Sequence, residues 1–271
     1  MCIMRKEAAM SDQTSKWKIY IVGHKKIHDE LMKDDKRFNN LNYTFLNVGQ
    51  LDKLEGSEKY NSVNQRDLSG YISLGRSWAE SEGIYNIWRS QSYKQLEYIG
   101  FLHYDIEFRL TRKFCPGGRT NITNRIEKYI RGRQKAHISF ATYLTKRDYA
   151  QKIIMDPSRP NDVTGDGINC YDQIIADYNL YFKTDYTLKD FFAHKYINLC
   201  SCFLIDVTTF DKMMFFFDWL VNSHKLDVYD IEQKHRFQGV MAERYFGVFM
   251  LFEYERSLNL SLVHQYDRGW K

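Results

Sequence analysis

The stretch that most constrains the fold of this chain runs over residues 97–108. Its first part is apolar, aromatic and β-branched, which predicts a buried strand over residues 97–104. Asp105 and Glu107 follow directly, two positions apart, so an extended chain would place both carboxylates on one face. Carboxylate oxygens are ligands that Mg²⁺ and Mn²⁺ prefer. The stretch therefore predicts a divalent-metal site at the end of a buried strand, the alternative being an ordinary solvated strand end.

The composition suits a globular protein that binds an anion. The chain has 271 residues, of which 44% are hydrophobic, enough for one large domain or two small ones with a core. Its net charge of +5 suits a nucleotide diphosphate and gives only weak support for a nucleic-acid partner, so none is expected. Five cysteines without a CxxC spacing indicate a reducing compartment. We expect no secretory signal and no membrane span, because residues 1–18 are polar and no apolar run reaches ~18 residues.

Strands and helices are predicted to alternate along the chain, which favours an α/β fold with a mostly parallel central sheet flanked by helices. The predicted strands cover residues 17–23, 43–48, 97–104, 136–143, 199–206 and 258–263. The predicted helices cover residues 29–38, 71–92, 126–133, 169–180, 188–194, 207–222 and 238–252. Loops are expected over residues 50–70, 108–124 and 156–167. We expect one domain over residues 17–271, behind a disordered lead over residues 1–16.

A second candidate site lies at the end of the first predicted strand. This strand ends at Gly23, and His24 and Lys25 follow it. Ligands of open α/β sheets bind beyond the carboxyl ends of the strands. The Gly-His-Lys turn is therefore predicted to approach a base or a phosphate, the alternative being an ordinary turn with solvated lysines.

Four segments are informative as a set because of the order in which they follow one another along the chain. They are Val22-Gly23-His24-Lys25, Glu80 with Tyr85-Asn86-Ile87-Trp88-Arg89, Tyr98-Ile99-Gly100-Phe101-Leu102-His103-Tyr104, and Arg236-Phe237-Gln238-Gly239-Val240-Met241-Ala242-Glu243-Arg244. This ordered set resembles a family of bacterial and viral glycosyltransferase-like proteins that are found with capsule and lipopolysaccharide genes and were formerly catalogued as a domain of unknown function. The match covers most of residues 17–252. The resemblance implies a GT-A-like single domain.

The chain departs from this family directly after the His-Tyr step, where the family usually has basic residues and this chain has the acid pair. In this respect it is similar to enzymes that decorate the capsid glycans of large algal viruses. In GT-A enzymes such acids contact the donor ribose and the metal on the diphosphate, and a histidine near the C-terminus often adds a ligand. The resemblance therefore implies that Asp105 binds ribose or metal, and that Glu107 and His264 bind Mn²⁺ or Mg²⁺. Alternatively, His264 is a surface histidine in the tail.

A transferase that inverts the anomeric centre needs a carboxylate to deprotonate the acceptor hydroxyl. Glu243 is the predicted base, because the adjacent Arg244 would help to keep it ionised. The alternative is a buried structural Glu–Arg pair. Asp166, in the loop over residues 156–167, is the reserve candidate. Together with Gly23, His24 and Lys25, Arg76 is the predicted donor-pocket residue.

The resemblance implies a metal-dependent hexosyl- or pentosyltransferase in the cytoplasm of a bacterium or of a virus-infected host cell. UDP is the expected donor nucleotide, xylose is favoured only through the viral resemblance, and a glycan is the expected acceptor. Two other classes stay open. A non-catalytic carbohydrate-binding protein would bind glycan without Mn²⁺ or nucleotide. A metal-dependent phosphodiesterase would use the same carboxylates, although such enzymes usually need more clustered acids and histidines.

Overall fold

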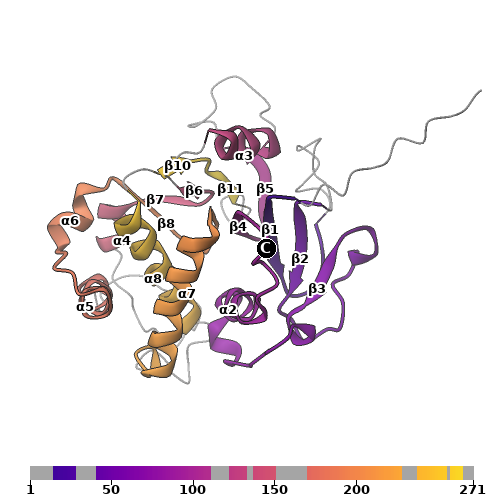
Figure 1. Ribbon diagram of the computed structural model, residues 1–271, viewed down its shortest axis with the longest axis horizontal. Coiled ribbons are helices and arrows are strands. Elements are labelled where there is room, and N and C mark those ends of the chain that lie inside the picture. Colours follow the sequence, from indigo (N-terminus) through magenta and orange to yellow (C-terminus); the bar gives the residue numbers. More distant parts are fainter. Residues whose placement is uncertain are drawn as a thin grey trace, which may run out of the picture.

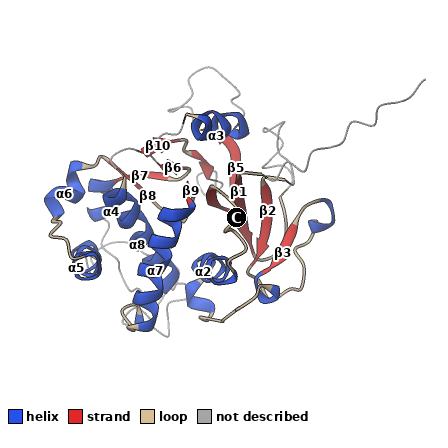
Figure 2. Cartoon of the chain, in the orientation of Figure 1, coloured by secondary structure: helices blue, strands red, loops and turns tan. Residues whose placement is uncertain are grey.

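The computed structural model describes residues 15–28, 41–110, 122–132, 137–150, 170–227, 237–254 and 257–264. Within this part, a seven-stranded sheet has the order β10-β6-β9-β4-β1-β2-β3 (Figures 1 and 2). The strands are β1 (Trp17–Gly23), β2 (Tyr43–Asn47), β3 (Ser62–Asn64), β4 (Tyr98–His103), β6 (His137–Ser139), β9 (Phe203–Asp206) and β10 (Ser257–Asn259). Among these strands, β9 is antiparallel to both neighbours and the other pairs are parallel. The predicted α/β class with a mostly parallel sheet is confirmed.

The predicted buried strand is β4, which lies between β1 and β9 in the middle of the sheet. Ile99, Phe101 and Leu102 are almost completely buried. The glycine in this strand has a steric reason, because a Cβ at Gly100 would lie 2.6 Å from the carbonyl oxygen of Phe203 on β9. The predicted buried strand therefore forms the middle of the sheet.

Side chains that alternate along the strands feed two hydrophobic cores, one on each face of the sheet. Tyr20 and Val22 of β1 join the larger core, and Ile19 and Ile21 join the other. Helices α2 (Glu80–Ser90), α5 (Tyr171–Phe182), α7 (Val207–Asn222) and α8 (Phe237–Glu253) build the larger core, and α3 (Ile122–Arg131) covers the opposite face. The short helices α4 (Thr145–Ala150) and α6 (Leu188–Ala193) lie with α5, to the left in Figure 1. None of the helices in the described ranges is long and apolar enough to cross a membrane.

Four short strands form two small antiparallel sheets outside the central one. Strand β5 (Ile106–Leu110) pairs with β11 (Leu262–His264), and β7 (Thr142–Leu144) pairs with β8 (Tyr196–Asn198). The single strands predicted over residues 136–143 and 258–263 are therefore wrong, because each is split between two sheets. Buried residues continue through both corners, at Phe140 and Leu260, so burial periodicity gives no sign of the break.

The helix predicted over residues 71–92 is wrong in its first half, since α2 begins only at Glu80. The backbone amides of Leu74 and Gly75 donate to Glu82 Oε2 (2.7 and 3.0 Å), and the amide of Ile72 donates to Asn86 Oδ1 (2.9 Å). Side chains of α2 thus accept these backbone N–H groups, which carbonyl oxygens would accept if the segment were helical. A 3₁₀ turn, η3 (Arg76–Trp78), joins this segment to α2.

Other predicted elements differ at their edges. The loop expected over residues 50–70 contains the edge strand β3 and the 3₁₀ turns η1 (Ser57–Lys59) and η2 (Gln65–Asp67). An edge strand has one neighbour and carries little apolar signal. Ser15 and Lys16, placed in the lead by the sequence, contact the sheet, and Lys16 Nζ lies 2.7 Å from Glu97 Oε1. The helix predicted over residues 29–38 and the loop over residues 156–167 lie outside the described residues.

A buried histidine on β6 predicts acid sensitivity. Burial, and then the charge of His194, lowers the pKa of His137 to about 3. An unfolded chain titrates this histidine near its ordinary pKa of about 6.5 and therefore binds the proton first, so stability falls as the pH drops below 6.5 toward 3. One proton over this interval corresponds to about 2 kcal/mol lost between pH 8 and pH 5. We expect His137→Phe to lose about 2 kcal/mol less than the wild type over the same interval.

Urea unfolding of both proteins at pH 8 and pH 5 measures this difference. The phenylalanine ring keeps the contact with Tyr254, whose ring lies 5.0 Å from that of His137, but cannot titrate. All other titrating groups are common to the two proteins and cancel. Equal losses in both proteins would contradict the assignment to His137.

Candidate functional site

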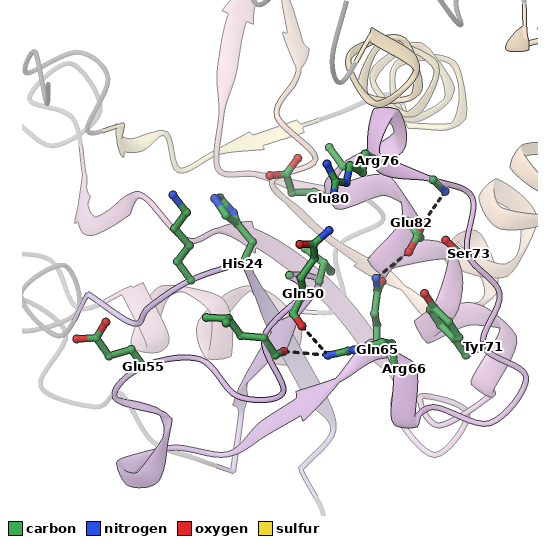
Figure 3. A pocket seen from close by; sticks show the side chains of 16 residues that line it. His24, Gln50, Glu55, Gln65, Arg66, Tyr71, Ser73, Arg76, Glu80 and Glu82 are labelled. Atoms are coloured by element: carbon green, nitrogen blue, oxygen red, sulfur yellow. Dashed lines mark hydrogen bonds between the residues drawn. The ribbon is translucent and has the colours of Figure 1, made fainter. Parts of the chain in front are cut away.

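A pocket of about 950 Å³ lies beyond the carboxyl ends of β1, β2 and β3 (Figure 3). Three segments line it: the turn after β1, the loop over residues 48–51 after β2, and η2 after β3. The segment from Tyr71 to Glu82, which leads into α2, forms a further wall, and Glu55 lines the pocket from the loop between β2 and β3. The pocket thus occupies the place where ligands of open α/β sheets bind.

The structure brings three predicted donor residues to this pocket. His24, Lys25 and Arg76 all line it, and Gly23 directly precedes the first two. The turn after β1 packs closely on the next loop, because a Cβ at Gly49 would lie 2.1 Å from the carbonyl oxygen of His24. The roles of these residues toward a nucleotide stay predictions.

Polar side chains hold the walls of the pocket in place. The Arg66 guanidinium donates to the carbonyl oxygens of Gln50 (3.2 Å) and Leu51 (3.0 Å), so it ties η2 to the loop after β2. Gln65 Nε2 donates to Glu82 Oε1 (2.7 Å), which ties η2 to α2 (Figure 3). Sequence reasoning missed these residues, because they lie in a stretch without apolar periodicity that was predicted to be a loop.

Behind the pocket wall, a buried histidine joins two carboxylates. His103, the last residue of β4, lies with Nε2 2.9 Å from Glu80 Oε1 and with Nδ1 2.7 Å from Asp105 Oδ1. The three residues are 7%, 5% and 8% exposed, respectively. Glu80 also lines the pocket, so this chain of contacts leads from the pocket to the predicted acid pair. We refer to Glu80, His103 and Asp105 as the buried triad.

The triad favours a protonated imidazole. Burial alone would lower the pKa of His103, but the charge of Glu80 and the hydrogen bond with Asp105 outweigh it and raise the pKa well above its ordinary value. A positive imidazolium with both N–H groups donating is therefore the form that these two carboxylates hold at neutral pH. The sequence signal was present, as a histidine at the end of a buried strand two residues before Asp105, but no role was assigned to it.

The backbone at the start of α2 is strained next to this triad. Ala79 has φ 48° and ψ −129°, a conformation that residues other than glycine rarely adopt. Helix α8 approaches closely here, because a Cβ at Gly239 would lie 2.7 Å from the carbonyl oxygen of Trp78. Ser77 also donates to Gln238 Oε1 of α8. Packing of α8 thus holds the strained residue directly before Glu80.

The predicted acid pair does not lie on one face of one strand. The chain turns at Tyr104 and Asp105, and the new strand β5 carries Glu107. Strand β11 runs antiparallel to β5, with Val263 opposite Glu107 and His264 opposite Ile106. The topology thus brings the backbone of His264 beside the acids despite the long sequence separation.

The metal roles of Asp105, Glu107 and His264 stay predictions. The position of the His264 side chain lies outside the described part. Within that part, no three acid, histidine or cysteine side chains are placed to hold a metal ion together. The carboxylates are nevertheless of the type that a hard cation needs.

Glu243 lies on α8, between the points where this helix approaches β8 and η3. Gly239 and Gly247, four residues on either side of it, share one face of the helix with it. A Cβ at Gly247 would lie 2.4 Å from the carbonyl oxygen of Asn198, while Gly239 contacts η3. Glu243 is half-buried between these two close approaches.

The carboxylates of two predicted site residues both raise the pKa of one thiol, that of Cys200. Burial is the main cause that raises the pKa of Cys200, and the carboxylates of Glu243 and then Asp105 raise it further. Cys200 and Ser201 have φ values of 58° and 49°, so the chain turns here before β9. The strand predicted over residues 199–206 is therefore confirmed only over Phe203–Asp206, and its predicted start is wrong. The structure therefore brings Glu243 and Asp105 near the same residue, Cys200, whereas Asp166 lies outside the described residues.

The expected pairing of Glu243 with Arg244 is not the principal one. The Arg244 guanidinium lies 3.8 Å from Asp148 Oδ1, and Tyr171 donates its hydroxyl to the same carboxylate. Burial opposes the charge of Arg244, but Asp148, Tyr171 and Cys170 raise its pKa, with Glu243 as the last contributor. Adjacent residues of a helix face different directions, which the motif by itself does not reveal.

No protein-family model and no curated protein sequence matches this chain. Its structure is similar to the apo structure of the WbbM bifunctional glycosyltransferase, with a TM-score of 0.55 and 16% identity over 92% of this chain and 45% of that chain. A structure of the mannosyltransferase Ktr4p from S. cerevisiae with GDP matches less closely, with a TM-score of 0.34 and 9% identity over 89% of this chain and 68% of that one. The chain thus spans less than half the length of WbbM. The likeness to WbbM confirms the predicted GT-A-like α/β fold.

Proposed function

We propose that this chain is a glycosyltransferase that moves a sugar from a nucleotide-sugar donor to a glycan acceptor. The observation that carries the proposal is the pocket beyond β1–β3, which adjoins the buried triad in a glycosyltransferase-like fold. A fold alone does not define a reaction, so the proposal rests on this site.

The pocket suits a nucleoside diphosphate in size and offers basic side chains for its phosphates, while Glu55, Glu80 and Glu82 line it as well. Its volume of about 950 Å³ falls at the upper end of the range for small-ligand sites, roughly 300–1,000 Å³. Lys25 and Arg76 supply positive charge, and His24 is a further hydrogen-bonding group for phosphate oxygens. UDP is the proposed nucleotide and xylose the favoured sugar, both on the strength of the sequence resemblance.

Asp105 and Glu107 are the proposed ligands of Mn²⁺ or Mg²⁺, with His264 as the third ligand. When bound, the metal would supply Lewis-acid stabilisation of the departing nucleotide diphosphate. Asp105 Oδ1 is already engaged by His103 Nδ1, which orients the carboxylate. Glu243, which like Asp105 lies near Cys200, is the proposed base that takes the proton from the acceptor hydroxyl in an inverting reaction.

Thermal unfolding with a panel of nucleotides and nucleotide sugars, with and without Mn²⁺, tests this function. A ligand at 100 times its Kd stabilises the folded state by about 2.7 kcal/mol, which raises the Tm of a chain of this size by several degrees. We expect such a shift for UDP or one UDP-sugar only with Mn²⁺. Glu107→Gln should abolish it, whereas Glu97→Gln, an exposed carboxylate before β4, should not.

The absence of a shift with every nucleotide would contradict the proposal. Binding of a glycan alone, without Mn²⁺ or nucleotide, would instead favour a carbohydrate-binding protein. A shift that is equally large in Glu107→Gln would support a nucleotide site but contradict the proposed metal ligand.

A further inference from the structure

We propose that His103 is a positioning residue. It bridges Asp105 to Glu80, which lines the donor pocket, and so fixes the position of the Asp105 carboxylate relative to this pocket. The inference rests on the proposed function. It goes beyond that function by assigning a role to two residues that contact neither the proposed metal nor, in the case of His103, the pocket. It also explains why a charged triad is buried at this point of the fold.

The geometry leaves the imidazole little freedom. Both ring nitrogens are engaged, at 2.9 Å by Glu80 and at 2.7 Å by Asp105, so rotation of the ring would break both contacts. His103 itself belongs to the central strand β4, which is paired on both sides. Because β4 holds the ring in place, the ring in turn holds the Asp105 carboxylate, which lies in the turn after β4.

The other end of the triad is equally well held. Glu80 is the first residue of α2, and the strained Ala79 before it is clamped by α8 through Trp78 and Gly239. A binding site needs side chains whose rotamers are locked by such supporting contacts. The pocket wall at Glu80 and the proposed metal ligand Asp105 are thus parts of one rigid unit.

The contact with His103 falls on the triad residue that is the proposed metal ligand, since His103 Nδ1 lies 2.7 Å from Asp105 Oδ1. Partners that hydrogen-bond to metal ligands typically change metal affinity by about 10–100-fold when they are removed.

Two substitutions separate the two contacts. The amide of glutamine reaches the position of His103 Nε2, so His103→Gln keeps a donor toward Glu80 and loses the contact with Asp105. The shorter His103→Asn places its amide near Nδ1, so it keeps the contact with Asp105 and loses that with Glu80. Calorimetry measures the affinity for UDP with and without Mn²⁺, and the ratio of the two affinities is the readout. A purely structural histidine would lower the Tm in both variants without changing this ratio.

We expect His103→Gln to lower the Mn²⁺-dependent gain in UDP affinity at least tenfold, because Asp105 is no longer held. His103→Asn should keep this gain within about threefold of the wild type. Without metal, both variants should bind UDP as weakly as the wild type does. His224→Gln, an exposed histidine after α7, is the matched control and should change neither affinity.

Should the His103 variants fail to fold, Glu80→Gln and Glu80→Leu form a second pair. Both remove the same charge from the pocket, but only glutamine keeps an acceptor for His103 Nε2. We expect the leucine variant to lose the Mn²⁺-dependent gain and the glutamine variant to keep it.

Equal Mn²⁺-dependent gains within either pair would overturn the inference while leaving the transferase proposal intact. A wild type that binds UDP equally with and without Mn²⁺ would also overturn it, because Asp105 would then hold no cation. A wild type that binds no nucleotide at all would show that the proposed function itself fails.

Discussion

Replacing Glu243 with glutamine is expected to lower sugar transfer by about 10²–10⁴-fold, the usual contribution of a general base, and to leave the Tm unchanged. Glu243 is half-buried on α8, and together with Asp105 its carboxylate raises the pKa of Cys200. Glutamine has the same shape but cannot accept the acceptor proton. The effect should fall on kcat rather than on donor affinity, because the donor pocket lies beyond β1–β3.

Product formation from the nucleotide sugar that stabilises the wild type measures this loss. Glu97→Gln serves as the control, since its carboxylate is exposed and pairs with Lys16 at the amino-terminal end of β4, the end opposite to Asp105. If Glu243→Gln retains more than a tenth of the wild-type kcat, Glu243 is not the base. Asp166 would then be the next residue to replace.

Replacing the neighbouring Arg244 with methionine is expected to lower the free energy of unfolding by about 3–5 kcal/mol. Arg244 is 9% exposed and Asp148 is 4% exposed, so the substitution leaves a buried carboxylate without its cation. Tyr171 can donate only one hydroxyl to Asp148 and cannot neutralise it. The charge itself, rather than the lost volume, is the reason for the large effect.

Urea unfolding at neutral pH measures this loss, and the double variant Asp148→Leu/Arg244→Met provides the control. Removing both charges eliminates the unpaired ion, so the double variant should recover most of the stability that Arg244→Met loses. A double variant that is no more stable than Arg244→Met would contradict the ion-pair argument and indicate lost packing. Together with Glu243→Gln, these variants test whether adjacent residues of one motif serve chemistry and folding separately.

Much of the fold could be predicted because burial periodicity is a local property. Strand β1 and helix α7 have the predicted bounds, and β4 lies within the predicted buried strand. The missed strands β3, β5 and β8 are short, and each lies at a sheet edge or in a two-stranded sheet. Their pairing depends on a neighbour that is distant in sequence, so periodicity within the segment is too weak to reveal it.

The sequence by itself determined the α/β class, the central strand and three residues that line the pocket. His24, Lys25 and Arg76 were predicted from the chain, and the structure places all three at one pocket. Only the tertiary structure decided which charged side chains pair with one another. It joined Glu80 to Asp105 through His103, and it turned Arg244 toward Asp148. Such pairings follow from how helices dock on the sheet, and electrostatic contacts over a few ångströms leave no periodic signal along the chain.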